Sequence, residues 1–241
     1  MKTLVPIILF VLPTLSDQNR YRRDFMYFAS ESNSTDSECI EKCNQKYRSA
    51  FEYALRTKVE DFYEFPFHPI VLDDAKYMVY CTLAEQKTVC YSQECNDLAA
   101  STDFSPSNFL CSFKKTLFDD SRKCLSMAEP ITFLKCDQEC HTPSTNSPTE
   151  VLHELQLYEG ELDRLCTFQQ CYLKCAKPII DEICDQQDAH NAITILESFV
   201  RWHSEDLTDW HRATGTQIAT SCEQLNNIKN DPVLQLILPV T

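Results

Sequence analysis

Apolar positions recur with helical spacing along this chain, most clearly after its first cysteine. Between residues 39 and 62, hydrophobic or cysteine positions return every three or four residues, and charged residues fill the other face. This period predicts an amphipathic α-helix with one stripe facing a core. Thr35 followed by Glu38 is a candidate capping box at its start. Pro66 and Pro69 prevent the helix from extending past them.

The next two predicted helices also carry cysteines. One is expected from Asp73 or Asp74, and it either continues through Cys90 and Cys95 or breaks and restarts there. Its predicted buried face holds Met78, Cys81 and Ala84. The other starts at Ser105 and Pro106, as N-cap and first helical residue, and is expected to bury Leu110, Phe113, Leu117 and Phe118. A separate short helix is expected to hold Ile131, Leu134, Cys136 and Cys140.

The second half of the chain begins with a polar stretch. Residues 141–149 (HTPSTNSPT) predict a solvated linker, which is also a candidate for O-glycosylation. A helix-start pattern follows at residues 147–150. After Gly160 we expect a cysteine-bearing helix that Pro178 breaks or restarts. The remaining helices are expected through residues 193–203 and around Cys222.

Glycine is nearly absent, and this disfavours a β-sheet protein. The chain contains only Gly160 and Gly215, whereas tight hairpins and bulges depend on glycine for positive φ angles. Together with the periodicity, this predicts an all-α fold, a disulfide-stapled bundle of about 6–8 helices.

The first sixteen residues have the composition of a secretory signal peptide. Lys2 gives a positive start, residues 4–15 are apolar, and Ser16 is a small residue suited to cleavage. A membrane anchor, the alternative, needs ~20 apolar residues, and two prolines interrupt this shorter run. We therefore expect a secreted, extracellular protein without a transmembrane segment.

The expected organisation has four parts. They are a signal peptide at residues 1–16, a flexible N-terminal segment at 17–36, one cysteine-rich helical domain at 37–226 and a C-terminal tail at 227–241.

The chain has fourteen cysteines, and this high number agrees with the predicted secretion, because secreted chains hold cysteine mostly as disulfides. They are Cys39, Cys43, Cys81, Cys90, Cys95, Cys111, Cys124, Cys136, Cys140, Cys166, Cys171, Cys175, Cys184 and Cys222. Zinc modules, the alternative, usually contain C-x2-C pairs, and none occurs here. We expect seven structural disulfides whose connectivity the sequence leaves open.

Cysteine parity bears on the organisation. Nine cysteines precede the linker and five follow it, so complete pairing requires at least one bond across the linker. Three C-x3-C pairs each share one helix face and can send two bonds to neighbouring helices. A bond within such a pair would be strained.

The excess of acidic over basic residues limits the classes of partner that the protein can bind. Loss of the signal peptide removes Lys2 and takes the formal charge from −14 to −15. An acidic surface repels nucleic acid and anionic lipid and favours solubility or cationic partners.

Cysteine order carries a family resemblance. Residues 166–184 (CTFQQCYLKCAKPIIDEIC) have the spacing C-x4-C-x3-C-x8-C, and residues 39–43 read CIEKC. With aromatics such as Tyr47, Phe51 and Tyr172, residues 39–206 resemble the chondroitin proteoglycan 4 family of nematode secreted proteins. They are also similar to a sister group of nematode secreted, cysteine-rich helical domains. The first resemblance implies a core protein that carries chondroitin in an extracellular matrix.

The chain departs from that family at the attachment site. Chondroitin is attached at a serine followed by glycine, but Gly160 follows Glu159 and Gly215 follows Thr214. We therefore expect the domain resemblance without the chondroitin.

Two short motifs suggest processing. Asn33-Ser34-Thr35 is an N-glycosylation sequon just before the first helix, so Asn33 is the expected site of a glycan. Residues 20–23 (RYRR, Arg20 to Arg23) match a dibasic cleavage pattern, although a solvated basic segment is the favoured interpretation.

No residue pattern supports catalysis or metal binding. The histidines are His68, His141, His153, His190, His203 and His211. The densest group runs from His203 to His211 with Glu205, Asp206 and Asp209, but His203 falls on an apolar helix face typical of a packed residue. No nucleophile or zinc-protease motif occurs. We expect no catalytic residues, no metal and no cofactor.

Two functions remain. The first is a non-enzymatic matrix or interaction role, with an extracellular protein or glycan as partner. The alternative is a carrier of a small apolar ligand, suggested by an aromatic-rich interior. Those aromatics are Phe51, Phe62, Phe109, Phe113, Phe118, Phe168 and Phe199. An ordinary packed core is the favoured interpretation of these aromatics, and a secreted enzyme or inhibitor would need a cleft that the sequence does not reveal.

Overall fold

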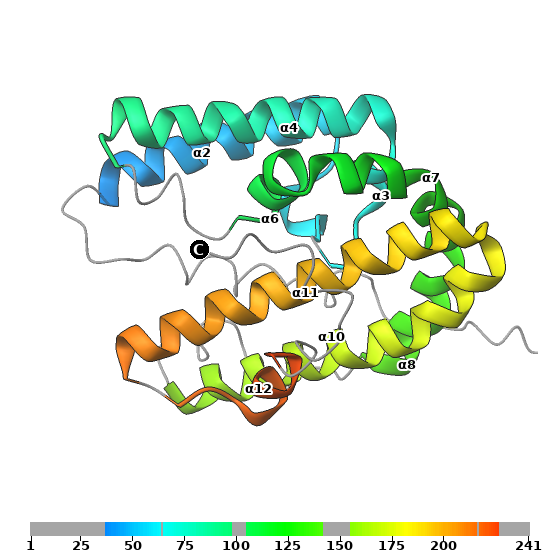
Figure 1. Cartoon of the computed structure of the whole chain (residues 1–241). Coiled ribbons are helices and arrows are strands. Elements are labelled where there is room, and N and C mark those ends of the chain that lie inside the picture. The colour runs from blue at the N-terminus through cyan, green and yellow to red at the C-terminus, as the bar shows by residue number, and fades with distance from the viewer. Residues whose placement is uncertain (1–36, 64, 98–104, 142–154, 216, 227–241) are drawn as a thin grey trace, which may run out of the picture.

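A computed structural model describes residues 37–63, 65–97, 105–141, 155–215 and 217–226. Within these ranges the chain forms helices and no strand, which confirms the all-α prediction. Counting π-helical turns as parts of the helices they continue, these described ranges contain eight α-helices. Figure 1 shows α2 and α4 side by side along one edge of the molecule and α10 and α11 along the other, with α7 between these pairs.

The pair α2 (Ser37–Leu55) and α4 (Asp74–Val89) forms the N-terminal layer. Helix α2 ends before the two prolines named in the prediction, because Arg56 adopts a left-handed φ of 56°. The Asp73 side chain accepts a hydrogen bond from the Lys76 amide at 2.9 Å and so caps α4. The predicted face of α4 was partly wrong, since Met78 is 58% exposed. Tyr77, Tyr80 and Leu83 are buried instead.

Three π-helical turns extend or join the helices. They are η2 (Cys90–Glu94) after α4, η3 (Phe109–Phe113) after α6 (Pro106–Asn108), and η4 (Phe133–Asp137) between α7 (Lys115–Thr132) and α8 (Gln138–Cys140). The helix predicted through Cys90 is therefore continuous to Glu94. The short helix expected around residues 131–140 is the continuation of α7. The expected burial of Phe113 was wrong, because its side chain is 67% exposed.

The C-terminal half packs two long helices against α7. Helix α10 spans Leu155–Ile183 and α11 spans Gln186–Thr214. Pro178 does not break α10, and Gly160 lies inside it rather than before it. Pro178 lies on the exposed side of the helix, where its ring meets solvent rather than a packed neighbour. Gly215 ends α11 with a φ of 70°, and α12 (Thr220–Asn226) follows.

Short elements connect these layers. The 3-10 turn η1 (Val59–Asp61) follows α2, and α3 (Pro69–Leu72) contacts both α4 and α7. Ser105 is the N-cap residue of α6, as predicted, but its hydroxyl lies 2.6 Å from that of Ser107 and does not cap the helix.

All fourteen cysteines are paired, and three of the seven bonds cross the linker, an odd number as parity requires. The pairs are Cys39–Cys95, Cys43–Cys90, Cys81–Cys111, Cys124–Cys184, Cys136–Cys175, Cys140–Cys171 and Cys166–Cys222. Each C-x3-C pair bonds to another helical segment, as predicted. Two of these pairs bond to each other and join η4 and α8 to α10.

The turn η2 explains why C-x3-C on α2 can bond to C-x4-C on the partner segment. In an α-helix, residues four apart share a face and residues five apart diverge. In η2 the amide of Cys95 donates to the carbonyl of Cys90 at 3.2 Å, five residues back, which is the π-helical pattern. Cys90 and Cys95 therefore face α2 together and reach Cys43 and Cys39.

Aromatic rings fill the core between the layers. Phe65 stacks on Phe199 with ring centroids 5.9 Å apart, and Phe109 meets the edge of Phe199 at 5.3 Å. Phe67 contacts Phe118 at 5.1 Å. The main hydrophobic cluster includes residues from α2 to α12, and a smaller separate cluster surrounds the two disulfides of η2. None of the described helices is both long enough and apolar enough to span a membrane.

Candidate functional site

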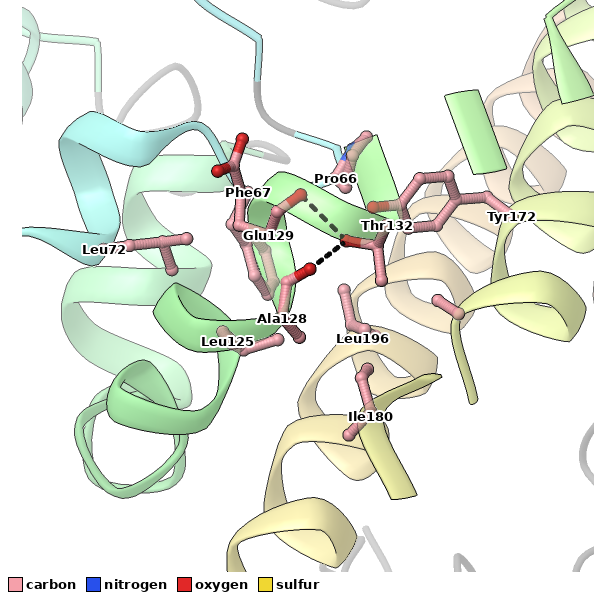
Figure 2. Close-up of a pocket in the computed structure, with 11 residues that line it drawn as sticks. Pro66, Phe67, Leu72, Leu125, Ala128, Glu129, Thr132, Tyr172, Ile180 and Leu196 are labelled. Atoms are coloured by element: carbon pink, nitrogen blue, oxygen red, sulfur yellow. Dashed lines mark hydrogen bonds between the residues drawn. The ribbon is translucent and has the colours of Figure 1, made fainter. Parts of the chain in front are cut away.

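A small pocket lies where α7, α10 and α11 meet the segment before α3. Figure 2 shows its lining side chains converging from these elements. They are Pro66, Phe67, Leu72, Leu125, Ala128, Glu129, Thr132, Tyr172, Ala176, Ile180 and Leu196. Residues 125, 128, 129 and 132 are three or four positions apart along α7, so one helix face supplies them. The wall is mainly apolar, with Glu129 as its one carboxylate among these residues.

The polar groups of this wall are largely engaged by the helix itself. The Thr132 hydroxyl donates to the carbonyl oxygens of Ala128 at 3.1 Å and Glu129 at 3.2 Å (Figure 2). Glu129 is partly buried, and this burial raises the pKa of its carboxyl because the charged form is poorly solvated. The pocket therefore presents one carboxyl with a weakened preference for charge, beside aliphatic and aromatic carbon.

The size of the pocket limits what it can hold. Its volume is about 20 Å³. A single water molecule needs roughly 10–15 Å³ by this measure, whereas sites for drug-sized ligands occupy about 300–1,000 Å³. The pocket can therefore enclose one water molecule and is far too small for a lipid.

Most of the aromatic residues considered for a carrier pack against one another. Phe51, Phe109, Phe118 and Phe199 are each at most 2% exposed and belong to the main core. Phe113 differs, since it is 67% exposed and its ring lies 5.9 Å from that of Trp202. These rings form the ordinary packed core that the sequence also allowed.

A wider hollow lies on the surface where α10 turns into α11. It is lined by Asp181, Gln186, Gln187, His190 and Ile193, opens to solvent and has a volume of about 680 Å³. Carboxylate, amide and imidazole groups with one aliphatic side chain suit a polar partner rather than a buried apolar one. Little in the sequence indicates this hollow, because its residues come from two helices joined by a short turn.

The group from His203 to His211 lies along α11, where the side chains of both histidines and of Glu205 are described. His203 and His211 are buried at 4% and 2% exposure, whereas Glu205 turns toward Arg201 and pairs with it at 3.2 Å. His203 is a packed residue, as its position on the apolar face predicts. Gln169 Nε2 lies 3.0 Å from its Nδ1. Burial lowers the pKa of His203 to about 3, because the imidazolium would lose its hydration.

Hydrogen bonds and a disulfide hold helix α12 against α10 and α11. The Ser204 hydroxyl donates to the Cys222 carbonyl at 3.0 Å, and Gln170 Nε2 donates to the Ser221 carbonyl at 2.6 Å. With Cys166–Cys222, these contacts hold the three helices together.

Groups with metal-ligand spacing among the described side chains involve disulfide sulfurs. Cys39, Cys43 and Cys95 form one such group, and Cys43 and Cys90 join Glu94 in another. In the folded chain their sulfurs are bonded to each other, so they are not thiolate ligands.

Several predicted sites lie outside the described residues. They are the signal peptide at 1–16, the dibasic residues 20–23, Asn33, the capping residue Thr35, residues 142–149 of the linker and the tail at 227–241.

Glu129, Gln169 and Ser204 were missed by sequence reasoning. A signal existed for Glu129, which falls between Leu125 and Thr132 on the buried stripe of α7, where a charged residue is unusual. Gln169 gave a similar signal between Phe168 and Tyr172. No sequence pattern pointed to Ser204, because the Cys222 carbonyl that accepts its hydrogen bond lies on another helix.

Comparison with known proteins identifies a family. No curated protein and no solved structure matches the chain. The family model described as "Uncharacterized protein B0403.3" matches residues 39–234, which include all fourteen cysteines. This agrees with the expected relationship to a nematode domain family, and the link to chondroitin proteoglycan 4 is not confirmed. Because the match covers most of its length, the chain belongs to the B0403.3 family.

Proposed function

We propose that this protein is a secreted, non-enzymatic extracellular protein that acts by binding, in a matrix or interaction role. The observation that carries the proposal is complete cysteine pairing, with seven bonds that link separate helical segments. Disulfides form and persist in oxidising compartments, whereas the cytosol keeps thiols reduced. A chain whose layers are joined this way is suited to the extracellular space.

The surface supports a binding role more than a catalytic one. The open hollow beside the α10–α11 turn offers polar side chains at the surface. The pocket between α7, α10 and α11 has room for about one water molecule, so this pocket gives the carrier alternative no support. Acidic composition favours a cationic partner or a glycan-bearing protein with basic patches.

The finer relationship to chondroitin proteoglycan 4 is part of the proposal only as a shared domain. Neither glycine follows a serine, so the chain lacks the usual attachment pair. We propose that it lies among matrix components without carrying chondroitin, and that Asn33 carries an N-linked glycan.

Expression of the full chain in a secretory eukaryotic host tests whether the protein is secreted. The protein should accumulate in the medium with a mass lower, by fourteen hydrogen atoms, than that of its reduced chain. N-glycosidase should reduce the apparent mass of the wild type but not of Asn33→Gln, and chondroitinase should change neither. Retention in the cytosol with free thiols would overturn the proposal.

The binding role needs a second experiment. The secreted protein, passed over decellularised extracellular matrix, should be retained in physiological salt. The double variant Gln187→Ala/His190→Ala should be retained less if the hollow takes part, while Glu139→Ala, an exposed change on α8, serves as the matched control. Complete flow-through of the wild type would contradict the matrix role.

A further inference from the structure

Two neighbouring disulfides close the end of the α2–α4 pair. Cys39–Cys95 and Cys43–Cys90, which we call the end clasp, join α2 to the segment around η2. The Cys43 and Cys95 sulfurs belong to different bonds, yet they lie only 3.6 Å apart. A movement of about 1.6 Å would bring them to the usual S–S bond length. Two alternative pairings are therefore nearly in contact in the folded protein.

The end clasp is isolated from the main core. Its cysteines and Tyr91 form a separate small cluster, with Ile40 packed against it. Tyr91 donates a hydrogen bond to the Asn44 side chain, and Lys46 pairs with Glu94 at 2.6 Å at the surface. The four sulfurs belong to this small cluster rather than to the main core, so exchange among them involves side chains outside the main core.

Access to the four sulfurs is unequal. Cys43, Cys90 and Cys95 are buried at 2%, 6% and 5% exposure, whereas Cys39, near the start of α2, is half-buried. A reagent from solvent therefore meets Cys39 first. Its attack on that sulfur releases Cys95, which is the sulfur already in contact with Cys43.

We propose that the end clasp is a thiol–disulfide exchange site for small monothiols of the glutathione class. The monothiolate attacks the Cys39 sulfur, forms a mixed disulfide there and expels the Cys95 thiolate. That thiolate attacks the Cys43 sulfur, so the Cys43–Cys95 bond forms and the Cys43–Cys90 bond breaks. Cys90 leaves as a thiolate and takes up a proton. The number of S–S bonds is unchanged, and one external thiol has become bound.

The variant Cys39→Ser tests the internal step without any added thiol. It leaves Cys95 free beside the intact Cys43–Cys90 bond. After alkylation and peptide mapping, we expect about a tenth or more of the molecules to carry the label on Cys90 with a Cys43–Cys95 cross-link. Exchange requires the thiolate, so its rate should rise about tenfold per pH unit below the thiol pKa. A label found on Cys95 alone, at every pH, would overturn the proposal.

The control is Cys81→Ser, which frees Cys111 on η3. Here the label should remain on Cys111, because the exchange depends on a second disulfide in contact rather than on a free thiol in this fold.

The wild type gives an independent readout that survives any folding defect of the variant. Secreted protein is incubated with glutathione, quenched in acid and alkylated. The expected products carry glutathione on Cys39 and the alkyl label on Cys90. Glutathione on Cys39 with the label on Cys95 would show that the reaction stops at the mixed disulfide and would contradict the second step.

Discussion

Individual buried polar residues hold neighbouring helices in register. The Tyr77 hydroxyl donates to the Leu110 carbonyl at 2.8 Å and connects α4 to η3. Burial raises the pKa of Tyr77 to about 12. Gln169 and His203 make a comparable contact between α10 and α11. At this scale a single atom can be removed and its contribution measured.

Replacing Tyr77 by Phe should destabilise the protein by about 1–3 kcal/mol, because a buried carbonyl loses a donor. Chemical denaturation of the oxidised protein measures the loss. Tyr53→Phe is the matched control, since Tyr53 is 74% exposed, and should change the free energy of unfolding by less than about 0.5 kcal/mol. Equal effects of the two changes would show that the hydroxyl of Tyr77 contributes nothing specific.

His203 should make the folded state sensitive to acid. Its pKa is about 3 when folded, below the ordinary value of about 6.5 expected on unfolding. Between these values the unfolded chain binds the extra proton, so stability falls as the pH drops below about 6.5 and levels off near 3. At pH 5 the loss should be about 2 kcal/mol.

Denaturation curves of wild type and His203→Gln between pH 4 and 7.5 check this. The variant should lose less stability on acidification than the wild type. His190→Gln, an exposed change on the same helix, should retain the wild-type slope. Parallel curves for wild type and His203→Gln would count against the assignment.

Side-chain burial also shows which residues could not be placed correctly from the sequence. The period of α4 was identified correctly, but its buried face includes Tyr77 and Tyr80 rather than Met78. Periodicity defines a stripe, whereas the elements packed on both sides decide which part of the helix they cover. Phe113 is the last residue of η3, just before Lys114 departs from helical geometry, and its side chain is exposed. Neither position could be assigned from local spacing.

Whole helices depend on how they begin, end and change register. The α-to-π change in η2 aligns two cysteines with α2, and Gly215 ends α11 in a left-handed conformation. Pro178 and Gly160 show the reverse case, because both lie inside α10 even though each disfavours helix. Tertiary packing of the long apolar stripe outweighs these local costs.

The two glycines should respond in opposite directions to alanine. Gly160 lies in α10 with no atom within 4 Å of the added Cβ, so Gly160→Ala should stabilise by about 0.5–1 kcal/mol. Gly215 has φ of 70°, so Gly215→Ala should destabilise by about 1 kcal/mol or more, even though space is available. Thermal unfolding of both variants measures the signs. Two shifts of the same sign would contradict the helix positions assigned to them.

The molecule as a whole is held by bonds that connect distant parts of the sequence. Three disulfides join the part before the linker to the part after it, through Cys124–Cys184, Cys136–Cys175 and Cys140–Cys171. Helix α7 also packs against both α10 and α11. The two parts therefore share a core as well as covalent links.

Cutting the chain between these parts should not separate them. A protease site inserted within residues 142–149 and cleaved in the oxidised protein should give one band without reductant and two bands with it. The far-ultraviolet circular dichroism of the cleaved, oxidised protein should keep its helical signal. Separation without reductant would show that the three disulfides across the linker are absent.

The sequence alone determined the helical class and the oxidised state that fourteen cysteines imply, because helical period and cysteine content are properties of local sequence and composition. The odd number of cysteines on each side of the linker also required at least one disulfide across it. Tertiary structure decided which cysteines pair, which face of α4 is buried, and the placing of Glu129 beside Leu196 and of Cys43 beside Cys95. These depend on the distance between segments far apart in the chain, which packing alone sets.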